Sequence, residues 1–111
     1  MTSKERAVLK GLAMKLKPIV NIGNQGLWEG SVEAVKEALE ANELLKLNVL
    51  QNCLEDTYDL ADQIAEATRS EVVSVIGRKI VLYKVADKPE NRKIVLKDLM
   101  KARNSAKKDR A

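Results

Sequence analysis

The sequence contains no histidine, one cysteine, three aromatic residues and two prolines among its 111 residues. Without histidine, the chain lacks the commonest general base and the commonest transition-metal ligand. Cys53 cannot form a disulfide within the chain and has no histidine to activate it as a nucleophile. We therefore expect no enzyme activity, no metal site, no cofactor and no small-molecule substrate, and we expect Cys53 to be a small core residue.

Long apolar runs are also missing. No stretch approaches the ~18 apolar residues of a membrane span, and the N-terminus leads straight into a charged amphipathic pattern. These features predict a cytoplasmic protein with no membrane partner. With so few aromatics, the core must consist of Leu, Val, Ile and Ala. The length fits one domain.

The charge is distributed unevenly along the chain, although the formal net charge is only +4. Residues 1–20 carry five bases and one acid, residues 21–70 carry three and ten, and residues 88–111 carry nine and three. This pattern predicts one surface that attracts a polyanion and another that repels it. The alternative is an ordinary mixture of solvated surface charges.

Apolar periodicity predicts the elements of the fold. Spacings of three and four residues predict helices over residues 3–16, from 28 or 31 to 42, and 55–70. Short apolar or alternating runs predict strands over residues 18–22, 44–50, 71–76 and 79–85. We expect Ser3 to cap the first helix. The order αβαβαββ predicts an α/β fold, a two-layer domain whose four-stranded mixed sheet has helices packed on it.

The pattern divides the chain into two parts. Residues 1–86 are expected to form the domain, and residues 87–111 a basic C-terminal tail. Within the tail, residues 97–106 are expected either to form a short basic helix or to order only on a partner.

The loop Gly23-Asn24-Gln25-Gly26 lies between a predicted strand and a predicted helix. A G-x-x-G turn lets backbone N–H groups approach a phosphate closely, and the helix start adds unpaired donors. The alternative is a simple tight turn in which Asn24 tolerates a left-handed conformation. We expect further positive charge around the loop, from Lys15, Lys17, Arg78 and Lys79.

Four segments together resemble the YhbY or CRM (chloroplast RNA splicing and ribosome maturation) domain family: residues 10–20, 22–30, 38–47 and 75–83. The resemblance covers about residues 3–85. It implies an RNA-binding domain similar to the C-terminal domain of translation initiation factor three. It also implies a partner RNA that is ribosomal RNA or a large-subunit precursor. The expected RNA-binding residues are Gly23, Asn24, Gln25, Gly26, Trp28, Lys15, Lys17, Arg78, Lys79 and Lys84.

Two positions depart from the family pattern. Lys84 stands where many members have Arg, so it keeps the charge but loses the bidentate fork. Trp28 stands where many members have a small hydroxyl residue, so capping falls to Ser31 or to the glycine backbone. Trp28 is expected either to pack in the core in phase with Val35 and Leu39, or to lie exposed and stack on a base.

The competing function is a protein-interaction module. In this interpretation the amphipathic helices dock a partner protein, without direct RNA contact. Binding to structured RNA that weakens with added salt would distinguish the two functions.

Overall fold

The computed structural model describes residues 1–92 and 94, so the tail prediction for residues 97–106 lies outside the described part. The elements are α1 (Ser3–Ala13), β1 (Val20–Ile22), α2 (Glu29–Asn42), β2 (Leu44–Val49), α3 (Thr57–Thr68), β3 (Glu71–Ile76), β4 (Lys79–Tyr83) and the 3-10 turn η1 (Pro89–Asn91). Their order is the predicted αβαβαββ, followed by the short turn.

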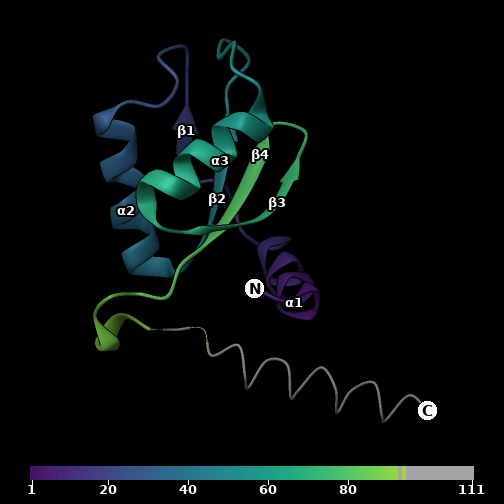
Figure 1. Cartoon of the computed structure of the whole chain (residues 1–111), viewed down its shortest axis with the longest axis vertical. Helices are drawn as coiled ribbons and strands as arrows, with labels where there is room; N and C mark the ends of the chain where they lie inside the picture. Colours follow the sequence, from purple (N-terminus) through teal and green to yellow (C-terminus); the bar gives the residue numbers. More distant parts are fainter. Residues whose placement is uncertain (93, 95–111) are drawn as a thin grey trace, which may run out of the picture.

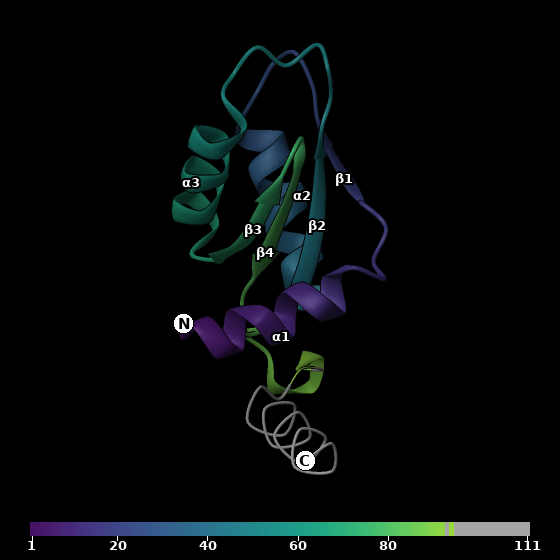
Figure 2. The ribbon, with the colours of Figure 1, turned by 90° about the vertical axis from the view of Figure 1, so that its right-hand side faces the viewer.

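The four strands form one mixed sheet in the order β1-β2-β4-β3. The first pair, β1 and β2, is parallel, and the other two pairs are antiparallel. Helices α2 and α3 lie on one face, and α1 crosses the other face at one end of the strands (Figures 1 and 2). The predicted α/β class is confirmed, and α1 adds a partial layer on the second face.

Side-chain alternation along the strands divides the core in two. In β4, Ile80 and Leu82 join a large cluster with α2 and α3, whereas Val81 and Tyr83 join a smaller cluster under α1. The large cluster contains the buried Cys53, which therefore acts as the small core residue that we predicted. The central strands thus support apolar packing on both faces.

The helix caps lie close to the predicted positions, with one correction. Helix α1 is capped by Thr2, not Ser3. The Thr2 hydroxyl accepts from the Glu5 N–H at 3.1 Å, and the Glu5 carboxylate accepts from the Thr2 N–H at 3.0 Å. The prediction of Ser3 missed this capping box by one residue. Asp56 caps α3, and its carboxylate accepts from the N–H of Tyr58 at 2.8 Å.

Two carboxylates at the end of α2 fasten the segment that follows β4. The Glu43 side chain is fully buried and accepts from the backbone N–H groups of Ala86 and Ile94, both at 2.8 Å. Glu40 accepts from the N–H groups of residues 87 and 88 at 2.7 and 2.9 Å. Ile94 packs against the cluster under α1. The packed part of the chain therefore continues past residue 86.

Candidate nucleic-acid interface

The loop of residues 23–26 is a closed turn at the end of β1. The Gly26 N–H donates to the Gly23 carbonyl at 3.0 Å. Gly26 has φ +64°, and a Cβ there would lie 2.7 Å from Oε2 of Glu55. Gly23 has no such constraint, since a Cβ there would meet Leu50 at 3.7 Å. The second glycine is thus required by the backbone, whereas at the first a Cβ would make only ordinary van der Waals contacts.

The two residues inside the turn are available to a ligand. Asn24 and Gln25 are exposed. In the part of the chain that the structure describes, their backbone N–H groups donate to no protein acceptor. Among residues 1–92 and 94, Glu43 and Arg69 are the only non-glycine residues with positive φ. The left-handed conformation considered for Asn24 is therefore absent, and the turn presents two free donors.

Hydrogen bonds join the loop end of β1 to the β3–β4 hairpin. The Leu50 N–H donates to the Ile22 carbonyl at 2.8 Å, and the Val49 N–H donates to the Arg78 carbonyl at 2.7 Å. The Arg78 guanidinium donates to the Leu50 carbonyl at 2.9 Å. The β1–α2, β2–α3 and β3–β4 connections therefore meet at one end of the sheet, called the loop end here (Figure 2). Arg78 is part of this end, as predicted, but one of its donors is already used.

A polar row crosses the exposed part of the sheet on the α1 side. Asn21 pairs with Asn48, and Asn48 pairs with Lys79, on three neighbouring strands. Lys46 lies two residues before Asn48, on the same face and closer to α1. The sequence analysis missed Lys46 and Asn48, although the alternation of apolar and polar residues in β2 would have placed both on one face.

Trp28 is exposed, with 55% of its surface accessible, so the core interpretation is wrong. Its backbone is extended because Trp28 precedes the first helical residue, Glu29. The indole lies against the backbone of Gly30, where any Cβ would overlap the ring. Ser31 completes the cap, since its hydroxyl accepts from the Trp28 N–H at 2.9 Å. The core contact at this turn comes from Leu27 instead.

Lys15 and Lys17 do not lie around the loop. They precede β1, whereas the loop follows it, so the length of the strand separates them from residues 23–26. Both are exposed and lie near the end of α1. The predicted grouping of four basic residues therefore reduces to Arg78 and Lys79 at the loop end.

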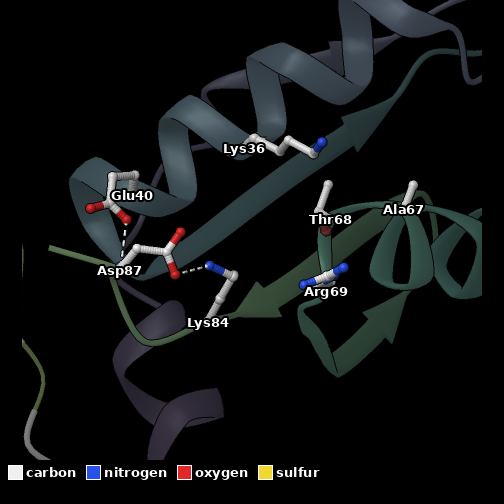
Figure 3. A pocket seen from close by; sticks show the side chains of 7 residues that line it. All are labelled: Lys36, Glu40, Ala67, Thr68, Arg69, Lys84 and Asp87. Atoms are coloured by element: carbon white, nitrogen blue, oxygen red, sulfur yellow. Dashed lines mark hydrogen bonds and ion pairs between the residues drawn. The ribbon is translucent and has the colours of Figure 1, made fainter.

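Lys84 lies in a different place, beyond the far end of β4. It lines a cavity of about 440 Å³ between the ends of α2 and α3 (Figure 3). Its ammonium group pairs with Asp87 at 2.9 Å. The neighbouring Glu40 accepts backbone N–H groups from Lys88 and Asp87, which hold its pKa below the ordinary value of 4.5. Lys84 is therefore separated from the loop by the length of the sheet.

Comparison with known proteins identifies the family. The model of the CRS1/YhbY (CRM) domain matches residues 1–84. The chain belongs to the CRS1/YhbY domain family. It is 42% identical over 96 residues to the probable RNA-binding protein YqeI of Bacillus subtilis, covering 86% of this chain and 98% of that protein.

Other CRM relatives agree in length and fold. An RNA-binding protein of Haemophilus influenzae is 33% identical over 87 residues, which cover 78% of this chain and 88% of the relative. The solution structure of the hypothetical protein SAV1595 from Staphylococcus aureus superposes with a TM-score of 0.71 at 38% identity, covering 86% of this chain and 99% of that chain. The predicted resemblance is confirmed. In the described part of this CRM chain, no helix is long and apolar enough to cross a membrane.

Proposed function

We propose that this chain binds RNA through the loop end of the sheet and the polar row beside it, and that the RNA belongs to the large ribosomal subunit or its precursor. The observation that carries the proposal is the turn of residues 23–26, whose two exposed residues offer free backbone donors. Such donors suit phosphate oxygens, which accept strongly and carry negative charge. No chemical step is required of the protein.

Positive charge near the turn supports the direction of approach. Lys79 is exposed beside Asn48 on the α1 side, and Arg78 lies at the hairpin tip. On the other side of the turn, the Glu55 carboxylate lies against Gly26 and would repel a phosphate. A backbone strand of RNA therefore approaches from the α1 side of the sheet. Asn21 and Asn48 supply donors and acceptors for sugars or base edges.

Trp28 gives this surface its stacking residue. The exposed indole begins α2, two residues after the turn, and the polypeptide backbone at Gly30 supports one face of the ring. Aromatic stacking contributes about 1–3 kcal/mol per base in single-strand recognition. We assign to Trp28 a contact with an unstacked base next to the phosphate held by residues 24 and 25.

The remaining basic residues extend the electrostatic surface. Lys15 and Lys17 lie on the α1 side, and the described chain ends at Ile94 against the cluster under α1. The nine bases of residues 88–111 add to this charge. They are proposed as long-range contacts that raise affinity without selecting sequence. Lys84 is proposed as a separate phosphate contact at the opposite end.

A double substitution in the turn tests the central proposal. Asn24→Asp with Gln25→Asp places two carboxylates where phosphates are expected. We expect affinity for a ribosomal RNA fragment to fall at least about tenfold at moderate salt, because each carboxylate repels a phosphate and occupies its approach path. Both positions are exposed, so the melting temperature changes little. Fluorescence anisotropy with labelled RNA measures the loss.

The matched control adds the same two charges on the other face. Ala34→Glu in α2 and Gln63→Glu in α3 are exposed positions far from the turn in the fold. The control is expected to lower affinity by no more than about twofold, through net charge alone. Equal losses in both double variants, with both folded, would exclude the turn as the RNA contact.

A further inference from the structure

A second surface, distinct from the loop end, lies between the end of α1 and the start of β1. It is a groove of about 430 Å³ with an aliphatic floor formed by Leu12, Leu16, Ile19 and Ile94. Ile19 is 58% exposed, and the two leucines are each 37% exposed. Large aliphatic side chains gathered in an open groove are the usual mark of a contact surface in a soluble domain.

Two lysines flank this aliphatic floor. Lys17 and Lys46 both line the groove, and no carboxylate is among the lining residues that the structure describes. The adjoining helix α1 adds Lys4, Arg6 and Lys10 against a single acid, Glu5, which is occupied by the cap with Thr2. The groove therefore combines an apolar floor with a positive rim.

We propose that this groove docks an acidic amphipathic segment of a partner protein. Leucine-like side chains spaced at three and four residues would enter the floor, as in other helix-in-groove complexes. Glutamate or aspartate on the flanks of the segment would face Lys17 and Lys46. Charge complementarity of this kind sets orientation and association rate, while the buried aliphatic side chains supply most of the affinity.

The chemistry of the groove favours a peptide over RNA. Single-stranded bases are held by aromatic rings or by arginine guanidinium planes. Within residues 1–92 and 94, the residues lining the groove include neither an aromatic residue nor an arginine. The aliphatic floor and the lysines at the rim instead match a helix whose apolar face is bordered by carboxylates.

The position of the groove gives the chain two independent binding surfaces. Ile19 lies at the start of β1, and the turn of residues 23–26 follows the end of that strand. The strand separates the groove from the turn, so the backbone donors of the turn stay accessible when the acidic segment is bound. The protein would thereby connect an RNA with a second protein. The groove includes no residue of the turn, although Lys17 and Lys46 border both surfaces.

The experiment selects peptides against the full chain and then removes the groove. A phage-displayed library of random 16-residue peptides is panned on the immobilised protein, and the enriched peptides are synthesised with a fluorescent label. We expect acidic sequences with apolar residues at positions i, i+3 or i+4, and i+7. Leu16→Lys should weaken the binding of these peptides at least about tenfold, because a charged side chain replaces part of the aliphatic floor of the groove.

Met14→Lys is the matched control. It adds the same charge at the residue that follows α1, but Met14 is 81% exposed and does not line the groove. The affinity of the Met14→Lys variant for the peptides should stay within about twofold of that of the parent, since charges outside the apolar floor mainly change the association rate. Lys17→Glu should weaken binding and reduce its salt dependence. Ile19→Gln serves as an uncharged second variant if Leu16→Lys lowers the melting temperature.

Four results would overturn the proposal. The panning could enrich no peptides, or only neutral or basic ones. The selected peptides could bind the Leu16→Lys and Ile19→Gln variants as tightly as the parent. A 20-nucleotide oligouridine could compete with them at the groove. Sedimentation could show a dimer that the Leu16→Lys variant abolishes, which would make a second copy the occupant. RNA affinity measured on the same variants separates failure here from failure of the RNA proposal.

Discussion

The two faces of the sheet use the same strands in opposite ways. On one face, α2 and α3 seal the large apolar cluster and show seven acids and one base to solvent. On the other face, α1 seals a smaller cluster and carries three bases and one acid, with Lys46 and Lys79 on the strands beside it. The difference teaches that alternation along a strand can separate stability from recognition. One face carries most of the packing, and the other presents positive charge to solvent.

The largest expected effect concerns the two cores. Leu60→Ala, in the large cluster, should reduce the free energy of unfolding by about 3–4 kcal/mol, because the surrounding side chains cannot fill the cavity. Leu9→Ala, in the small cluster, should cost about 2 kcal/mol, because α1 can shift on the sheet and close part of the space. Urea denaturation measures both. A larger loss of unfolding free energy for Leu9→Ala than for Leu60→Ala would mean that the face under α1 carries most of the packing.

Charge reversal on each face gives the next effect. Lys46→Glu with Lys79→Glu on the α1 side should lower RNA affinity at least about tenfold and reduce the salt slope by ~0.7 per lost single-strand contact. Lys36→Glu with Arg69→Glu makes the same change beside the cavity in Figure 3. This control should lose less than about threefold. If it loses as much as the first pair, RNA also contacts the α2–α3 face, and Lys84 gains support as part of that contact.

Trp28 tests whether recognition extends past the turn to the start of α2. Its exposed indole should emit as indole does in water, and added RNA should quench the emission. Trp28→Ala should weaken RNA binding by about 1 kcal/mol through lost stacking, with little change in melting temperature. Emission that RNA leaves unchanged, together with full affinity in the alanine variant, would limit recognition to the backbone donors.

The smallest expected effect concerns the pH dependence of stability, in a comparison of two acidic residues of α2, Glu40 and Glu37. Bonds from the N–H groups of Lys88 and Asp87 lower the pKa of Glu40 below its ordinary value of 4.5. Its stabilising contribution is therefore complete above that value and is lost as the pH falls through the lower folded-state value. Glu40→Gln should remove this part of the acid sensitivity. Glu37→Gln, which removes the same charge at an exposed position of the same helix, is the matched control.

The sequence predicted the order of the elements and the class of the sheet, because burial imposes periods of two and 3.6 residues. The predictions were wrong at residues whose positions are not determined by the periodicity of burial. Trp28 is in phase with the α2 stripe, but it precedes the helix and has extended backbone, so the helical phase does not apply. Lys15 and Lys17 are close to the turn in sequence, yet an extended strand carries the turn away from them. The contact between Gly26 and Glu55 joins distant segments and leaves no local pattern.

The buried carboxylate of Glu43 also defines where the folding unit ends. The family model ends at residue 84, whereas two of the backbone donors to Glu43 come from residues 86 and 94. A chain shortened to residue 84 would remove both of these donors from a carboxyl group with no exposed surface, and a buried polar group that loses hydrogen bonds is destabilising. The packed part of the chain is therefore longer than the family model. Hydrogen bonds to Glu43 and Glu40 fasten its C-terminal segment, and shortened versions meant for binding studies should keep residues 1–94.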